Sequence, residues 1–205
     1  GERMAGTIEN GGSKEIYTSD YDGENQRRVT TGFSLNINST WSPDGRSIAY
    51  TSYIRGLPNI FVSHIFQGTR DELTKNSGNN FLAVFSPDGT RIAFISNRDQ
   101  AGNTEVYVMN ADGSNVQRLT NNPAADTTPT WNPQGTQIAF TSDRSGSPQI
   151  WVMGVDGLGQ RQLTHESYAD RPTWSPAPYN EIAYAAKTGP GQDIKILDLA
   201  TREVR

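Results

Sequence analysis

Two histidines, His64 and His165, are the side chains in this 205-residue sequence best suited to act as a general base or a metal ligand near neutral pH. His64 ends an alternating apolar segment, whereas His165 follows a Leu-Thr pair, so their contexts differ. The sequence contains no Gly-x-Ser-x-Gly elbow, phosphate-binding loop or His-Glu-x-x-His motif that would accompany such chemistry. We therefore expect packing or surface roles for both histidines, and no catalytic residue, metal site or cofactor.

One acidic segment has a weak likeness to a calcium-binding loop. Asp20, Asp22 and Gly23 supply its beginning, but the later ligands and the closing glutamate are missing. A hairpin turn is the better interpretation of this segment, because Asp-Gly is a strong turn signal.

Composition excludes several other functions. The sequence has no cysteine, which rules out disulfides and cysteine nucleophiles and is compatible with either cytosol or periplasm. Its 18 basic residues against 22 acidic ones give a net charge of -4, which argues against nucleic-acid and anionic-membrane binding. No apolar run approaches the roughly 20 residues that span a bilayer. Because the sequence starts at Gly1 without an initiator Met, we expect a processed, tagged or truncated product.

The sequence repeats one phrase four times, and these phrases start 44, 46 and 43 residues apart. They are Trp-Ser-Pro-Asp-Gly at 41–45, Phe-Ser-Pro-Asp-Gly at 85–89, Trp-Asn-Pro-Gln-Gly at 131–135 and Trp-Ser-Pro-Ala-Pro at 174–178. Each phrase leads into an apolar alternating segment that begins Ile-Ala, then a third segment, and, in three repeats, a fourth that closes in Leu-Thr. Short β-branched and aromatic segments between turn residues are typical of β-strands.

The turn residues predict how these strands are joined. Pro presets the first central position of a type I turn, and Gly45, Gly89 and Gly135 should follow with positive φ. The last repeat has one extra residue, and Asn180 is expected to replace the glycine there. The phrase aromatics recur once per repeat and should pack between neighbouring blades; they are Trp41, Phe85, Trp131 and Trp174.

Four antiparallel strands every 40–45 residues predict an all-β fold, a β-propeller. About five blades are expected in part or whole, from a ring of six. Residues 1–14 should be a frayed remnant of a preceding strand or linker, and the propeller should occupy 15–205. Its expected parts are an outer half-blade at 15–30, full blades at about 34–74, 79–120 and 125–164, and an incomplete blade at 168–205.

These phrases, in this order, resemble the propeller repeats of the TolB family, the periplasmic component of the bacterial Tol-Pal envelope system. The resemblance covers residues 15–204 and includes Ser-Asp-Arg-x-Gly at 142–146 and Asp-Leu-Ala-Thr at 198–201. It implies a six-bladed ring, a small α/β domain before it, periplasmic localisation, and the peptidoglycan-associated lipoprotein Pal and other Tol proteins as partners. The sequence differs in lacking that α/β domain and in starting and stopping inside blades.

The loops that join successive blades are the candidate binding surface, since function on rigid scaffolds concentrates in loops. They vary in length and are rich in Asn, Asp, Thr and Arg, and each feeds the innermost strand of a blade. Repeat alignment with the family implies that Pal contacts fall just before each phrase aromatic. The predicted partner-binding residues are Asn36, Asn38, Asn80, Leu82, Asp126, Thr128, Asp170 and Arg171.

Three functions remain open at this point. The first is a non-catalytic scaffold that binds a Pal-like lipoprotein at the channel mouth. The second is the substrate-gating propeller of a prolyl-oligopeptidase-type serine peptidase, and the third is an extracytoplasmic sensor propeller. An incomplete ring should also expose strand edges and apolar faces, so we expect either self-association or the rest of the propeller as a separate segment.

Overall fold

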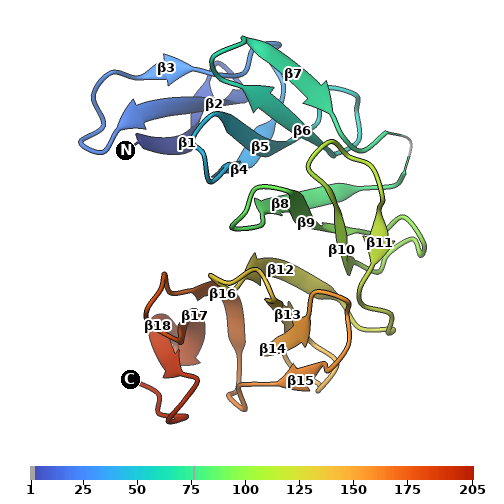
Figure 1. The fold of residues 1–205 in the computed structure, drawn as a ribbon, viewed down its shortest axis with the longest axis vertical. Coiled ribbons are helices and arrows are strands. Elements are labelled where there is room, and N and C mark those ends of the chain that lie inside the picture. Colours follow the sequence, from blue (N-terminus) through green and yellow to red (C-terminus); the bar gives the residue numbers. More distant parts are fainter. Residues whose placement is uncertain (1–2, 76) are drawn as a thin grey trace.

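The computed structural model describes residues 3–75 and 77–205, and the regular elements in this part of the chain are β-strands (Figure 1). They form five antiparallel sheets, which follow one another around an open ring as the blades of a propeller (Figure 1). Blades 2, 3 and 4 have four strands each, and blades 1 and 5 have three. None of the described residues forms a helix that could cross a membrane.

Each blade is a meander in which consecutive strands pair. Blade 1 contains β1 (Arg3–Asn10), β2 (Ser13–Asp20) and β3 (Arg27–Arg28). Blade 2 contains β4 (Asn36–Trp41), β5 (Ser47–Ser52), β6 (Asn59–His64) and β7 (Thr69–Glu72). Blade 3 contains β8 (Asn80–Phe85), β9 (Arg91–Ser96), β10 (Glu105–Asn110) and β11 (Gln117–Arg118). Blade 4 contains β12 (Asp126–Trp131), β13 (Gln137–Ser142), β14 (Gln149–Gly154) and β15 (Arg161–Gln162), and blade 5 contains β16 (Ala169–Trp174), β17 (Glu181–Thr188) and β18 (Gly191–Asp198).

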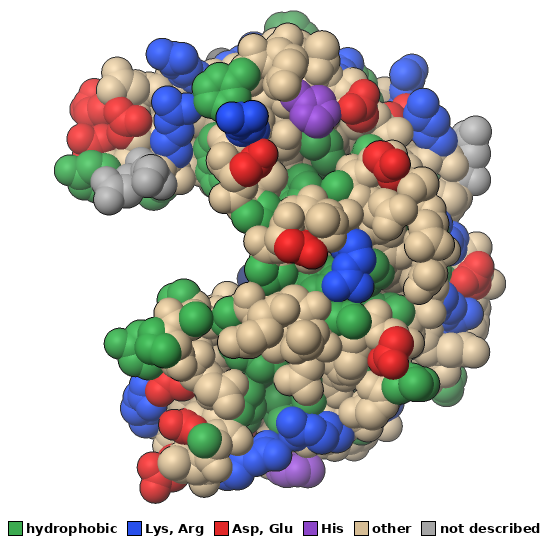
Figure 2. All heavy atoms as spheres, viewed as in Figure 1, with side chains coloured by type: hydrophobic (Ala, Val, Ile, Leu, Met, Phe, Trp, Pro, Cys, Tyr) green, Lys and Arg blue, Asp and Glu red, His purple; other side chains and the backbone are tan. Residues whose placement is uncertain are grey.

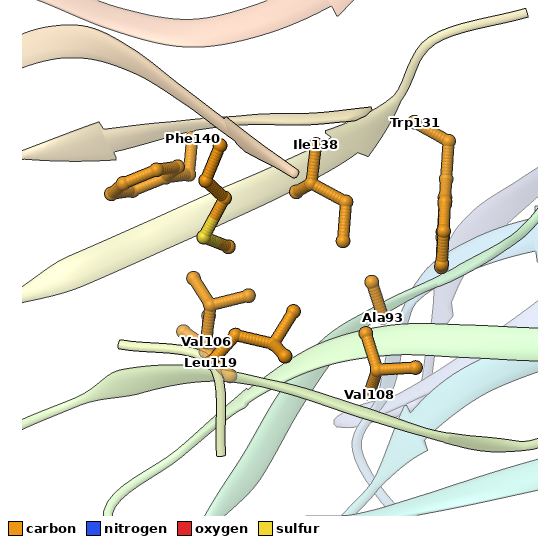
Figure 3. Close-up of a cluster of buried hydrophobic side chains, with 9 residues drawn as sticks. Ala93, Val106, Val108, Leu119, Trp131, Ile138 and Phe140 are labelled. Atoms are coloured by element: carbon orange, nitrogen blue, oxygen red, sulfur yellow. The ribbon is translucent and has the colours of Figure 1, made fainter. Parts of the chain in front are cut away.

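The hydrophobic core lies between successive blades. The middle strands β5, β9 and β13 are buried along almost their whole length, because a neighbouring blade covers each of their faces. Figure 3 shows one such layer, where side chains of blades 3 and 4 meet. Its labelled members are Ala93, Val106, Val108, Leu119, Trp131, Ile138 and Phe140. Burial of apolar area of this kind is the main favourable contribution to folding.

The phrase aromatics pack in these layers, as predicted. Trp131 is buried, and its Nε1 donates to the carbonyl oxygen of Val84 in the preceding blade at 3.2 Å. The Arg91 guanidinium lies over the Trp131 ring at 4.8 Å from the centroid. Trp41, Phe85 and Trp174 are half-buried, and each packs against a separate apolar cluster.

The predicted turn glycines have positive φ, with 67° at Gly45, 72° at Gly89 and 67° at Gly135. The expectation for Asn180 is wrong, since Asn180 is absent from the positive-φ residues. That turn instead contains a cis Ala177–Pro178 peptide, and the Tyr179 amide donates to the carbonyl of Pro176 at 3.2 Å. A type VI turn therefore replaces the type I turn of the other repeats.

Both ends of the chain have more structure than the repeat pattern predicts. Within 1–14, expected to be a frayed remnant, Arg3–Asn10 form β1, which pairs with all eight residues of β2. Blade 1 is thus more than the expected outer half, although none of its described residues forms a strand equivalent to β4. In blade 5, Leu197 and Val204 form a β-bridge, and Ile196 and Arg205 exchange two backbone hydrogen bonds. Pairing with an available strand edge satisfies backbone groups that would otherwise face water.

The ring formed by these five blades is open. Blades 1 and 5 lie on opposite sides of a wide gap, which is visible both in the ribbon and in the space-filling view (Figures 1 and 2).

Candidate partner-binding site

The innermost strands of blades 2 to 5 share a β-bulge that the repeat pattern did not reveal. Pairing with the next strand shifts register between Ile37 and Thr40 in β4, and at the equivalent place in β8, β12 and β16. One residue in each bulge has left-handed backbone: φ is 56° at Asn38, 53° at Leu82, 48° at Thr128 and 54° at Arg171. A bulge redirects side chains, and bulges are frequent at barrel rims and beside functional sites.

These four bulge residues are among those predicted to bind a partner, and none is fully buried. Asn38 and Arg171 are exposed, whereas Leu82 and Thr128 are half-buried. An amide, an isobutyl group, a hydroxyl and a guanidinium therefore occupy one repeated backbone position. Such a position keeps a constant shape and can vary its chemistry from blade to blade.

The predicted residues at the start of the innermost strands lie inside the protein. Asn36, Asn80 and Asp126 are at most 3% exposed. The Asn36 amide donates to the Glu15 carboxylate at 2.9 Å, and the Asn80 amide donates to the Asn59 side-chain oxygen at 3.2 Å. Their hydrogen bonds anchor the blade-to-blade crossover, so these side chains offer nothing to a partner at the surface.

Asp126 is held by an arginine that sequence analysis did not select. Arg144 donates from Nη2 to Asp126 Oδ2 at 2.7 Å, and its guanidinium lies 4.7 Å from the Trp151 ring centroid and 5.5 Å from that of Phe140. Arg98 holds Asn80 in the same way, donating to its side-chain oxygen at 2.8 Å. Each arginine thus fastens the start of an innermost strand to the loop between the second and third strands.

Asp170 does not occupy the position of Asn36, Asn80 and Asp126; Ala169 does, and Asp170 lies one residue later. Its Oδ1 accepts a hydrogen bond from the Thr141 hydroxyl at 2.9 Å, and Thr141 also contacts the Thr128 hydroxyl at 2.8 Å. The Arg171 amide donates to Thr141 at 3.2 Å. The structure thereby brings Thr128, Asp170 and Arg171 together through Thr141, a residue that repeat alignment passes over.

Tyr168 adds to this network from the crossover into blade 5. Its hydroxyl donates to Asp170 Oδ2 at 3.0 Å. Burial raises the pKa of Tyr168, and the hydrogen bond to the Asp170 carboxylate raises it further. The phenol therefore stays protonated and remains a donor.

The Leu-Thr phrase fastens the fourth strand of a blade to its third. The Thr120 hydroxyl donates to Glu105 Oε2 at 2.6 Å and accepts from the Val106 amide at 2.9 Å. Thr30, Thr74 and Thr164 accept from the equivalent amides at the same distance. Buried Glu105 also accepts from Arg118 and from the Asn122 amide in the crossover. Glu105 is therefore a structural carboxylate, because its hydrogen-bond donors are Arg118, Thr120 and the Asn122 amide.

His64 lies between a serine and an aspartate, a Ser-His-Asp series of contacts that the sequence did not suggest. His64 Nδ1 lies 2.9 Å from the Ser47 hydroxyl, and Nε2 lies 3.0 Å from Asp71 Oδ2. Ser47 and His64 are cross-strand partners, so their contact follows from sheet register. The Asp71 side chain is 65% exposed, so it holds the His64 ring only weakly in one orientation. The backbone amide of Ser47 donates to the Ser42 hydroxyl. His165, by contrast, is exposed and lies 3.2 Å from the Gln162 amide.

No group of three or more His, Asp or Glu side chains in residues 3–75 and 77–205 is placed to hold a metal ion.

The geometry defines a class of protein: a β-propeller whose innermost strands, in blades 2 to 5, each present one variable side chain on a fixed bulge. The profile of the family described as TolB beta propeller domain (PD40) matches residues 3–205. The chain belongs to this TolB propeller family.

Individual relatives agree with this assignment. The Tol-Pal system protein TolB of Anaeromyxobacter dehalogenans (strain 2CP-C) is 43% identical over 129 residues, which are 63% of this chain and 29% of that protein. The crystal structure of TolB from Acinetobacter baumannii superposes with a TM-score of 0.86 at 29% identity, covering 100% of this chain and 52% of that one. A putative TolB from Agrobacterium tumefaciens gives 0.83 at 25% identity, covering 97% and 74%. The matched segment of this chain therefore spans less than a third of the curated relative.

More distant propellers share the fold alone. An oligogalacturonate lyase in complex with manganese superposes over 100% of this chain and 61% of its own, with a TM-score of 0.76 but 14% identity. Likeness at this level says nothing about shared chemistry.

Proposed function

We propose that this propeller is a non-catalytic, periplasmic scaffold of the Tol-Pal system that binds a Pal-like lipoprotein through the bulges of its innermost strands. The observation that carries the proposal is the repeated left-handed bulge at Asn38, Leu82, Thr128 and Arg171. Support for the system comes from the relatives, which are named Tol-Pal system protein TolB. Other Tol proteins are expected partners on the same ground.

Burial narrows the surface that such a partner would touch. Asn36, Asn80 and Asp126 hold crossovers in place and would act only as positioning residues. The partner would instead contact the four bulge residues and Asp170, whose side chain is 19% exposed. Arg171 is 81% exposed and is the best single probe, since its guanidinium can form bidentate pairs with a partner's carboxylate.

The test is calorimetric titration of this chain with the soluble domain of a peptidoglycan-associated lipoprotein from the same organism. Arg171→Glu and Leu82→Arg should each weaken binding by about thirtyfold or more, the scale of an interface hot spot. Arg161→Glu makes the same charge change on the outer strand β15 and should leave the affinity unchanged. Equal affinity of all four proteins would contradict the proposal, as would the absence of binding.

A further inference from the structure

A cleft between the outer strands of blades 1 and 2 differs from the equivalent places between blades 2 and 3 and between blades 3 and 4. In the third blade, the turn between third and fourth strands lies on the preceding blade: a Cβ on Gly113 would lie 3.1 Å from the carbonyl oxygen of Leu73. In the fourth blade, a Cβ on Gly157 would lie 2.6 Å from that of Leu119. The turn of blade 2 is different, since Gly68 has nothing within 4 Å of its Cβ position.

The space left between these two blades is a cleft of about 710 Å³. Val29, the counterpart of Leu73 and Leu119, lines this cleft while also packing against the apolar cluster of blades 1 and 2, and Gly68 lines the opposite wall. A volume of this size is within the range of small-molecule sites, roughly 300–1,000 Å³.

The charge of the cleft is opposite to that of the whole chain. Four arginines line it (Arg3, Arg27, Arg28 and Arg70) against one acidic residue, Asp20, although the net charge of the chain is -4. Such a concentration of one sign in a concave site attracts ligands of the other.

The nearby acidic groups leave three of these cations without an ion pair. Arg28 is paired with buried Glu15 at 2.8 Å, and His64 lies against Asp71. Asp20 accepts a hydrogen bond from the Asn25 amide at 2.6 Å. Within the described part of the chain, no acidic side chain forms an ion pair with Arg3, Arg27 or Arg70.

We propose that this cleft binds a small polyanion, a molecule with two or more carboxylate or phosphate groups. Arg27 extends from β3 and Arg70 from β7, so a ligand between the two walls can pair with both blades. Guanidinium groups match the planar geometry of carboxylate and phosphate and bind them through two parallel hydrogen bonds. The site lies on outer strands and is separate from the bulges of the innermost strands.

The experiment is calorimetric titration of the full chain with citrate and, separately, with pyrophosphate at fixed ionic strength. We expect the Arg27→Ala/Arg70→Ala variant to lose about tenfold or more in affinity for whichever anion binds. Stronger binding of citrate would identify carboxylates as the recognised groups, and stronger binding of pyrophosphate would identify phosphates.

Arg161 provides a matched control. It pairs with Val152 on β14 as Arg27 pairs with Thr18 on β2, is exposed, and lines no part of the cleft. Arg161→Ala should bind as the unmodified chain does. If it weakens binding as much as the double variant, or if neither anion binds, the proposal is overturned. Should the double variant fail to fold, Arg27→Gln and Arg70→Gln singly carry the same expectation in smaller degree.

Discussion

Aspartate in the turn after an innermost strand shows how one side chain organises a hairpin. In blade 3, Asp88 Oδ1 accepts from the Ser86 hydroxyl at 2.5 Å and from the Thr90 amide at 3.0 Å. These bonds favour the charged carboxylate and lower the pKa of Asp88 from 3.8 to about 2. The equivalent turn of blade 4 has Gln134, and there the Asn132 side chain accepts from the Thr136 and Gln137 amides instead.

The lowered pKa of Asp88 predicts a loss of stability in acid. A carboxyl that is more acidic in the folded chain contributes stability above its ordinary pKa, and that contribution disappears as the pH falls from about 4 towards 2. Asp88→Asn should therefore lose less stability between pH 5 and pH 2.5 than the unmodified chain, measured by urea unfolding. Gln134→Asn removes no charge and should leave the pH dependence unchanged. An Asp88→Asn variant with the full pH dependence would show that this turn contributes nothing to it.

Turns between third and fourth strands act at the scale of the element, because in blades 3 and 4 they seat one blade on the next. The contact depends on glycine twice: a side chain at Gly157 would meet the Leu119 carbonyl, and the backbone there has a φ of 81°. Gly45 has a similar left-handed backbone, with a φ of 67°, but its Cβ position is open. Comparing Gly45 with Gly157 therefore separates the cost of left-handed backbone from the cost of a side chain that meets its neighbour.

Alanine should lower the unfolding free energy by different amounts at these two glycines. Gly45→Ala bears only the conformational cost, about 1–2 kcal/mol of unfolding free energy. Gly157→Ala bears a comparable backbone cost and also pushes blade 4 away from blade 3, so it should be the more destabilising. Denaturant unfolding of both variants measures this difference. Equal losses of unfolding free energy would mean that the contact between the Gly157 turn and the Leu119 carbonyl adjusts without cost.

At the scale of the whole molecule, the open ring leaves apolar side chains exposed on its two end blades. Ile8 on β1 is 37% exposed, and Ile194 on β18 is 71% exposed. Among the described residues no blade lies in the gap beside blade 1 or blade 5 (Figure 1), and exposed apolar side chains on such strands favour association between chains.

We predict that this chain self-associates through its end blades, as measured by size-exclusion light scattering over a range of concentrations. The double variant Ile8→Lys/Ile194→Lys should shift the chain towards monomer, because a charged side chain on such a strand opposes pairing. Leu158→Lys is the control, since Leu158 is 70% exposed but lies in a turn of blade 4. A chain that is monomeric at every concentration would refute the prediction.

Local patterns were enough to predict the blades, most of their strands and the turns that join them. Strands and turns depend mainly on residues close in sequence, as in the Ile-Ala, Pro-Asp-Gly and Leu-Thr patterns. The residue types alone therefore predict them. The first strand escaped notice because Arg3–Asn10 is mostly exposed and carries no repeat phrase. It forms because β2 offers an edge with which it can pair.

The candidate site shows where sequence information stops. Repeat alignment selected the first residues of each innermost strand but could not separate buried Asn36, Asn80 and Asp126 from the bulge residues two positions later. Leucine and threonine ordinarily avoid left-handed backbone, so nothing in the residue types marks Leu82 or Thr128. The bulge places one more residue on the innermost strand than on the segment it pairs with, as residues 36–41 pair with 48–52, and only the tertiary structure decides which side chains it turns outward.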